Sequence, residues 1–388
     1  VVLEAGTYYE SGLTIPPGVT IASETGDPEG VTIDATGLSG RVLHVVDADS
    51  TTAIIGITAT GGGGVALGGG LLCERATPTV IDCVFEGNAA TSGGGVACSE
   101  GSSATFIGCR ITGNSSTDGG GVYCTGGSSA EFSLCTLDAN VATGAGGAVR
   151  CDSLSAPTFA SCTIAGNEAP LSGGSGLSVG DGSSATLDMT IVALGVTGEA
   201  LACEGSGTAT FACSDLHGNA GGDWTGCVSG QGTIAGNFSL DPDFCAAGSG
   251  DYHITAVSPC ADAPGCGLVG ALAAGCVSDP DIDVSPTSFT FDLSAGETAT
   301  DSLLISDLGR PDLTWLVRES AAARGDGGRV GQPIKARVVA ERAMAQREAS
   351  PPIPHAETGK GEIDPRPGRG PARGTGGPDA YGYSWVDS

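Results

Sequence analysis

The central part of the sequence repeats itself every 25 to 27 residues. Each unit begins with a glycine-rich triplet, which starts at Gly68, Gly93, Gly119 and Gly146. A cysteine follows five residues later, a second cysteine ten or eleven residues after that, and an asparagine five residues further on. Because three independent markers keep one period, the repeat indicates a structural unit that recurs along the chain.

Within each unit, apolar residues alternate with polar ones over short stretches that Gly, Ser and Asn interrupt. Val96 and Cys98 share one face, and Phe106, Cys109 and Ile111 mark the next segments. A period of two is typical of strands. One unit with two or three such strands cannot bury its own apolar face, whereas stacked units can. The sequence therefore predicts an all-β fold built on a parallel β-helix solenoid, right-handed by the general rule for parallel crossovers.

Stacking places equivalent residues above one another and so predicts ladders inside the solenoid. A buried asparagine can bond to its neighbour's amide along the stack, and the cysteines pack as small apolar residues. In-register strands hold cysteines too far apart for disulfides along the stack, while a bridge within one coil, such as Cys98–Cys109, stays open. The predicted ladder residues are Asn88, Asn114, Asn140, Asn167, Asn219, Cys73, Cys98, Cys124, Cys151, Cys203, Cys83, Cys109, Cys135 and Cys162.

The regularity changes outside this stretch. At residues 174–195 the markers become Val179, Thr190 and Gly195, and the pattern then resumes with Cys213 offset by one residue. Later cysteines have new spacings, and we expect two disulfides among them, with the pairing left open. These cysteines are Cys245, Cys260, Cys266 and Cys276. The predicted domains are the β-helix (1–227), a terminal coil with a Cys-rich cap (228–277), a partial immunoglobulin-like β-sandwich segment (278–318), a disordered Pro/Gly/Arg-rich linker (319–380) and the start of a further domain (381–388).

The charge is unevenly distributed. Residues 1–309 contain 34 acidic residues and only four basic ones, all arginines. Such a surface repels nucleic acid, anionic lipid and polyanionic polysaccharide. No apolar run is long enough to cross a bilayer, so we expect no membrane insertion. Metal-binding motifs are absent, and we predict no cofactor; the surface carboxylates could bind calcium only loosely.

The chain contains fifteen cysteines, which favours an oxidising compartment. It starts in the middle of a strand pattern and stops abruptly. We therefore expect it to be a piece of a longer protein whose targeting signals lie outside it.

Few residues suggest catalysis. The best acid–base cluster is Asp215, His217 and Asp223, because residues i and i+2 of one strand share a face and a second carboxylate could orient the imidazole. A turn with surface polar residues explains the same pattern more simply. His44 and His253 are isolated in the sequence, and we expect both to be structural.

The GGG-V-x-C and C-x-I-x-x-N units resemble the right-handed β-helix repeats of bacterial surface and secreted proteins, including polymorphic outer-membrane proteins. The opening segments, Leu3–Tyr8 and Gly18–Ile21, resemble the first coils of the pectate-lyase-like superfamily. The resemblance implies the fold, which hosts both enzymes and adhesins. Because the coils are regular and the solenoid has few basic residues, we expect an extracellular or cell-surface protein without catalytic activity, which acts as an adhesin, a glycan-binding protein or a rigid display scaffold. Its expected partners are a neutral glycan or another surface protein. The alternative is a carbohydrate-active enzyme, either a polysaccharide lyase or a glycoside hydrolase, on the same fold.

Overall fold

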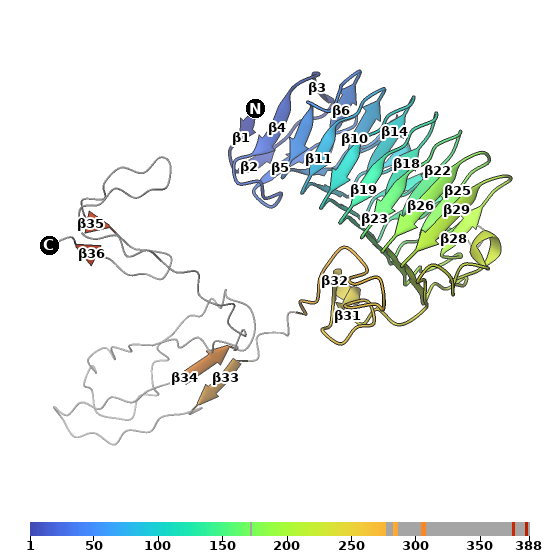
Figure 1. Cartoon of the computed structure of the whole chain (residues 1–388). Helices are drawn as coiled ribbons and strands as arrows, with labels where there is room; N and C mark the ends of the chain where they lie inside the picture. The colour runs from blue at the N-terminus through green and yellow to red at the C-terminus, as the bar shows by residue number, and fades with distance from the viewer. Residues whose placement is uncertain (171–172, 277–281, 286–303, 308–374, 377–384, 387–388) are drawn as a thin grey trace, which may run out of the picture. The chain divides into compact units, whose positions relative to one another are not determined.

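The computed structural model describes residues 1–170, 173–276, 282–285, 304–307, 375–376 and 385–386. The chain divides into two compact units, Val1–Ser278 and Asp279–Ser388. The first unit is a parallel β-solenoid (Figure 1), in which each strand pairs with its equivalents in the coils before and after it. This pairing is what the 25–27-residue repeat predicts.

Four parallel sheets run along the solenoid. Sheet 1 contains β1 (Val2–Leu3), β4 (Thr20–Ser23), β7 (Ala53–Ile55), β11 (Thr79–Ile81), β15 (Thr105–Ile107), β19 (Glu131–Ser133), β23 (Thr158–Ala160), β26 (Ser184–Asp188) and β29 (Thr208–Ala212). Sheet 2 contains β2 (Gly6–Tyr8), β5 (Val31–Asp34), β8 (Thr58–Thr60), β12 (Val84–Glu86), β16 (Arg110–Thr112), β20 (Thr136–Asp138), β24 (Thr163–Ala165), β27 (Ile191–Ala193) and β30 (Asp215–His217). Sheet 3 contains β3 (Leu13–Ile15), β6 (Leu43–Val46), β10 (Leu71–Glu74), β14 (Val96–Ser99), β18 (Val122–Cys124), β22 (Val149–Cys151), β25 (Leu177–Val179) and β28 (Leu201–Cys203). The shorter sheet 4 contains β9 (Val65–Leu67), β13 (Ala90–Ser92), β17 (Ser115–Asp118) and β21 (Val141–Ala145).

The core is a set of stacked side chains, because alternate residues of every strand point inward. Phe106, Phe132 and Phe159 lie in successive coils of sheet 1 and are fully buried. Their rings stack in parallel, with centroids 4.7 Å apart for the first pair and 4.9 Å for the second. The ring spacing thus follows the spacing of parallel strands, about 4.8 Å.

Glycine is required at the turns between sheets 4 and 3. Gly93 adopts a φ of +67°, which side chains rarely tolerate. A Cβ atom on Gly94 would lie 2.5 Å from the carbonyl oxygens of Gly120 and Ser115. The triplets therefore allow the backbones of successive coils to approach closely.

The second cysteine of each coil belongs to a buried ladder at the turn between sheets 1 and 2. The thiols of Cys83, Cys109, Cys135 and Cys162 each donate to two backbone carbonyls. Hydroxyls replace the thiols in the next two coils, where Thr190 and Ser214 bond to the corresponding carbonyls.

The offset of Cys213 has a structural reason. Ser214, rather than Cys213, continues this ladder. Cys213 itself occupies the preceding turn position, where its φ is +48°. The equivalent residues Asp82, Ser161 and Met189 are also left-handed.

The asparagines form a second ladder at the turn after sheet 2. Oδ1 of Asn114 accepts bonds from the backbone and side-chain nitrogens of Asn88 at 2.9 and 3.2 Å. Asn114 and Asn140 donate in the same way to the next asparagine along the stack. Gly195 interrupts the ladder, and its backbone N–H donates to Oδ1 of Asn219 at 3.0 Å.

The solenoid ends in two segments, a cap formed by residues 220–238 and a lobe that follows it. The cap contains the 3-10 turn η1 (Gly226–Val228), and Gln231 bonds to the backbone of Ala209 and Phe211 at the end of sheet 1. We call residues 239–276 the C-terminal lobe. It contains β31 (Phe244–Ala246), η2 (Ala247–Ser249) and β32 (Asp251–Ile254), and its hydrogen bonds to sheet 2 are described below.

In the second unit, β33 (Ile282–Ser285) pairs antiparallel with β34 (Leu304–Asp307). A separate short pair joins β35 (Thr375–Gly376) and β36 (Trp385–Val386). Most of the predicted sandwich segment (278–318), the linker (319–380) and the last segment (381–388) lies outside the described residues.

Candidate functional site

The three residues of the predicted acid–base cluster do not form one site. Asp215 and His217 lie on β30 and share its outer face, because Leu216 between them is in the core. Asp223 instead lies at the end of the asparagine ladder, where its Oδ1 accepts bonds from the backbone and side-chain nitrogens of Asn219. No ion pair joins His217 to either carboxylate in the part of the chain that the structure describes. Two residues of the predicted cluster thus lie on the outer face of β30, and the third has a structural role at the end of the asparagine ladder.

The C-terminal lobe covers Asp215 completely. The residue has no exposed surface, and its Oδ1 accepts a hydrogen bond of 3.0 Å from the backbone N–H of Leu240. The thiol of Cys260 donates to Oδ2 at 3.5 Å. Burial raises the pKa of Asp215 to about 7, and the nearby charges of Asp223 and Asp241 act in the same direction. A group of this pKa is suited to proton transfer near neutrality, but no substrate can reach it while the lobe is in place.

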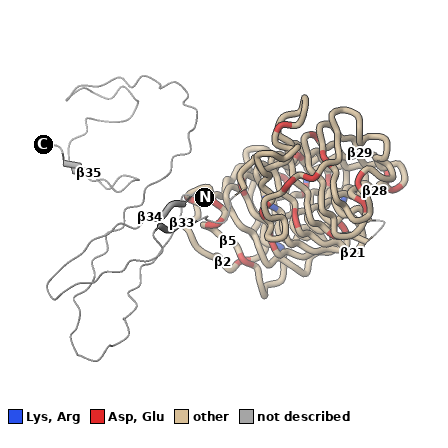
Figure 2. The backbone as a smooth tube through the Cα atoms, turned by 90° about the horizontal axis from the view of Figure 1, so that it is seen from below, with Lys and Arg blue, Asp and Glu red and all other residues tan. Residues whose placement is uncertain are grey.

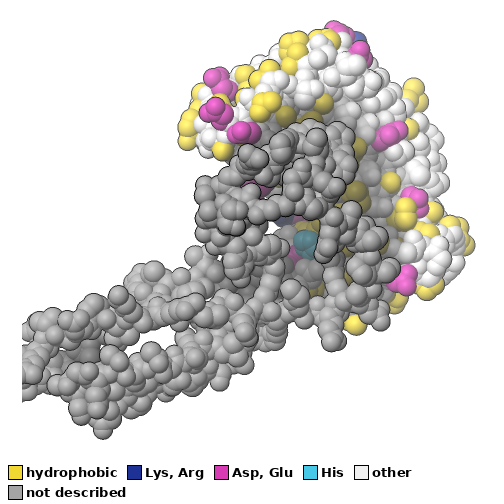
Figure 3. Space-filling model, turned by 60° about the vertical axis from the view of Figure 1, so that its left-hand side comes forward, with side chains coloured by type: hydrophobic (Ala, Val, Ile, Leu, Met, Phe, Trp, Pro, Cys, Tyr) yellow, Lys and Arg dark blue, Asp and Glu magenta, His cyan; other side chains and the backbone are white. Residues whose placement is uncertain are grey.

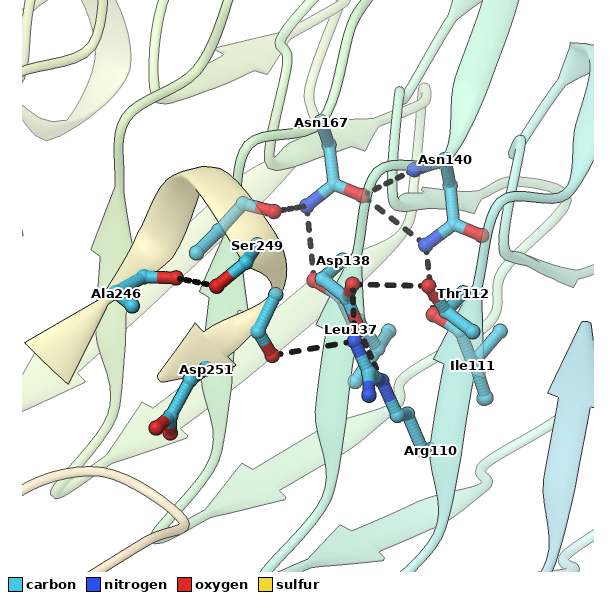
Figure 4. Close-up of polar contacts among 12 residues, drawn as sticks. Arg110, Ile111, Thr112, Leu137, Asp138, Asn140, Asn167, Ala246, Ser249 and Asp251 are labelled. Carbon is cyan, nitrogen blue, oxygen red and sulfur yellow. Dashed lines mark hydrogen bonds and ion pairs between the residues drawn. The ribbon is translucent and has the colours of Figure 1, made fainter. Parts of the chain in front are cut away.

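The edge of the lobe meets sheet 2 at Arg110 (Figure 4). The guanidinium of Arg110 forms two parallel bonds of 2.9 Å to the carboxylate of Asp138 and donates to the carbonyl of Gly250 at 3.3 Å. Thr112 donates to the same carboxylate at 2.8 Å. Beside them, burial raises the pKa of Tyr252 to about 12. Arg110 thus joins the lobe to the solenoid and is paired with a buried carboxylate.

Two histidines acquire carboxylate partners that the sequence did not predict. Nδ1 of His253 lies 2.7 Å from Oδ1 of Asp251 on β32. Figure 4 shows the carboxylate of Asp251 directed away from Arg110. Residues i and i+2 of one strand share a face, and this was the signal that could have found the pair.

The second pair lies on the outer face of sheet 3. Nε2 of His44 is 3.7 Å from Oε2 of Glu74. Burial and the neighbouring charge of Arg41 lower the pKa of His44, and Glu74 opposes this shift. The two residues are 30 positions apart in coils with an irregular spacing, so no sequence motif could indicate their proximity.

The cations of the solenoid are already engaged. Arg75 contacts Asp47, Glu74 and Glu100. Arg150 binds Glu204, with one bond of 2.9 Å. Acidic residues, in contrast, are scattered along the backbone of the solenoid (Figure 2), and acidic side chains lie at several places on the face seen in Figure 3.

The remaining arginine is Arg41, which donates to the carbonyl of Leu67 and is half-buried. Burial lowers its pKa. Within the described residues, no group of His, Cys, Asp and Glu is arranged to hold a metal ion. In the described part of the chain, each arginine is thus bonded to a carboxylate or to a carbonyl, which weakens its attraction for an acidic substrate.

The disulfides correct the sequence prediction. Cys245 bonds to Cys276, which is one pair within the predicted set. Cys266, however, bonds to Cys213 of the solenoid, and Cys260 remains a buried thiol. The lobe folds back onto sheet 2 and thereby brings Cys266 beside Cys213.

Cys203 was predicted as a packed ladder thiol, and this was wrong. It keeps the register of the ladder beside Val179 but lies in the last coil, where the cap supplies Cys227 as a disulfide partner. Cys98 and Cys109, for which a bridge within the coil was open, are both free.

Two shallow pockets lie at the C-terminal end of the first unit, on either side of residues 237–240. One, of about 420 Å³, is lined mainly by residues of the lobe, including Val257, Pro259 and Asp262. The other, of about 780 Å³, is lined by uncharged residues, including Trp224 and Thr233. The second pocket therefore presents an uncharged concave surface in an acidic protein.

A comparison with models of protein families agrees with this fold. Residues 43–192 match the family model described as the right handed beta helix region. A crystal structure of the pectate lyase Pel9A aligns with 71% of this chain and 87% of that chain, at 13% sequence identity and a TM-score of 0.45. No curated protein matches the sequence. The two helical segments of the first unit are single 3-10 turns, and no helix among the described residues could span a bilayer.

Proposed function

We propose that this right-handed parallel β-helix repeat protein is a non-catalytic scaffold, extracellular or on the outer cell surface, that binds a neutral glycan or another surface protein. The observation that carries the proposal is the state of the charged groups. Arg75, Arg110 and Arg150 are paired with carboxylates, and Asp215, His217 and Asp223 do not form a catalytic constellation. Among the described residues, each arginine is bonded to a carboxylate or to a carbonyl, which leaves little free positive charge to hold an acidic polysaccharide.

The three disulfides support an extracellular location, because such bonds persist in oxidising compartments. All three lie at the end of the solenoid, where stacking no longer protects the core. A regular solenoid whose end is cross-linked by disulfides is suited to a display or binding role.

The alternative is a carbohydrate-active enzyme for a neutral substrate. One observation favours it, namely the pairing of His253 with Asp251 at 2.7 Å, since a carboxylate that orients an imidazole is a common feature of acid–base sites. The imidazole is about one-third exposed. No nucleophile is placed beside it by the contacts of the described residues.

A glycan array tests the binding part of the proposal. We expect neutral glycans, and not uronic-acid polymers, to be retained. Thr233→Lys places a charged side chain in the uncharged pocket and should abolish retention, whereas Thr158→Lys, on the exposed face of sheet 1, should not. Retention of uronic-acid polymers would contradict the proposal, and unchanged retention by Thr233→Lys would move the glycan site away from the pocket.

A further inference from the structure

Asp215 lies between two packed layers that belong to different parts of the first unit. On one side is the outer face of sheet 2, and on the other is the C-terminal lobe. An apolar cluster surrounds the junction, formed by Ile191, Ala193, Ile254, Cys260, Ala263 and Val269. A carboxylate in such a place is costly when it is charged and unpaired.

The partners of Asp215 do not neutralise a charge. Its two hydrogen-bond donors are the backbone N–H of Leu240 and the thiol of Cys260, both from the lobe. The other titratable groups that act on it, Asp223 in the cap and Asp241 in the lobe, are acidic. His217, on the same strand, forms no ion pair with it among the described residues.

We propose that the C-terminal lobe is a pH-sensitive latch, which closes firmly over sheet 2 when Asp215 is protonated and loosens when Asp215 is ionised. The other hydrogen bonds between the lobe and the solenoid join uncharged groups, except for one that the guanidinium of Arg110 donates. Ala271 N–H donates to Oγ1 of Thr163 and Gly270 N–H to the carbonyl of Met189. Arg110 donates to Gly250 at the far edge.

The direction of the effect follows from the raised pKa of Asp215. Because the closed lobe raises the pKa from 3.8 to about 7, closure binds a proton. Closure is therefore strongest below pH 3.8, weakens as the pH rises towards about 7, and changes no further above that pH because both states are then ionised. The Cys213–Cys266 disulfide keeps the lobe tethered throughout, so the change is a local loosening around residues 238–246 and not a departure.

Loosening would uncover Asp215 on the outer face of sheet 2. The latch is independent of the proposed scaffold role, because it depends only on the junction between the lobe and the solenoid. It identifies Asp215 as the residue that links pH to the accessibility of this face.

Hydrogen exchange of the oxidised protein tests the proposal. Peptides that contain Leu240 are followed between pH 5.5 and 8.5, with correction for the intrinsic exchange rate. We expect their protection to fall on the order of 30-fold over this range. Asp215→Asn, which is isosteric and uncharged, should abolish the dependence, while the control Asp262→Asn, at an exposed position of the same lobe, should retain it.

Two results would overturn the latch: protection in the wild-type protein that does not change with pH, or a pH dependence that persists in Asp215→Asn. If Asp215→Asn does not fold, Cys260→Ala provides a second test. Loss of the thiol donor removes one of the two bonds to the ionised carboxylate. The fall in protection of the Leu240 peptides should therefore extend to higher pH in Cys260→Ala than in the wild type. An unchanged pH dependence of this protection would also contradict the proposal.

Discussion

Oδ1 of Asp223 accepts two hydrogen bonds from Asn219, one from the backbone nitrogen at 2.9 Å and one from the side-chain nitrogen at 2.8 Å. Asn88, Asn114 and Asn140 each donate the same pair of bonds to Oδ1 of the next asparagine along the stack. Asp223 thus takes the place of one more asparagine and ends the ladder. The carboxylate of Asp223 therefore has a structural role and does not require a catalytic one.

Asp223→Ala should lower the free energy of unfolding by about 1–3 kcal/mol, because two buried donors lose their acceptor. Asp223→Asn should lower it far less, since an amide oxygen can accept the same bonds. Chemical denaturation measures both values, with Glu131→Ala, an exposed substitution on sheet 1, as the control. Equal losses for the alanine and asparagine variants would show that the acceptor oxygen is not what matters.

Asn114→Leu should be more damaging than the loss of the terminal cap. Its amide joins three coils, because it accepts from Asn88 and donates to Phe85 and Asn140. We expect the free energy of unfolding to fall by about 3 kcal/mol or more. The melting temperature checks this against Thr105→Val on the outer face of sheet 1, and an unchanged value for Asn114→Leu would contradict the ladder.

The cysteine ladder at the turn between sheets 1 and 2 accepts either a thiol or a hydroxyl. Thr190 receives a bond from the backbone N–H of Cys162 and donates to Asp188. Thr190→Cys should therefore change stability by less than about 1 kcal/mol, whereas Thr190→Val, which keeps the shape but loses both bonds, should cost about 1–3 kcal/mol. Denaturation midpoints compare the two, and a valine variant as stable as the cysteine variant would refute the bonding role.

The ion pair of Arg150 and Glu204 should make stability fall in acid. Bonding to Arg150 lowers the pKa of Glu204, so the stabilisation is present above its ordinary value of 4.5 and is lost as the pH falls through the lowered value. Glu204 is half exposed, and the effect is about 0.2–1 kcal/mol. Melting curves between pH 3 and 6 should show a shallower acid slope for Glu204→Gln than for the wild type; parallel curves would exclude the contribution.

The disulfide arrangement gives a direct count. Alkylation of the denatured, unreduced protein should label nine cysteines, since six of the fifteen are bonded. Peptide mapping should find Cys260 labelled and Cys266 linked to Cys213. A peptide that links Cys260 to another cysteine would disprove this arrangement.

The sequence predicted the fold well where its markers recur at constant spacing. The markers of one coil keep the same spacing as those of the next coil, as for Gly93, Cys98, Cys109 and Asn114. Stacked coils with this spacing pair in register and form parallel sheets. The irregular coil was also visible, although the role of Thr190 as a hydroxyl substitute needed the contacts themselves.

The sites were harder to predict, because they depend on how the end of the chain folds back. Nothing near Asp215 in the sequence indicates that Leu240 and Cys260 will cover it. The pairing of Cys213 with Cys266 over 53 positions has the same origin. Spacing rules describe one coil and its neighbours, but they carry no information on a lobe outside the repeat.

We propose that the protein binds or displays without catalysis. To test this, the oxidised protein is incubated with a panel of neutral and acidic polysaccharides between pH 5 and 9. New reducing ends and unsaturated products are then measured for the wild type and for His253→Ala. We expect no turnover above the buffer control for either protein. Turnover by the wild type that His253→Ala abolishes would instead establish an enzyme.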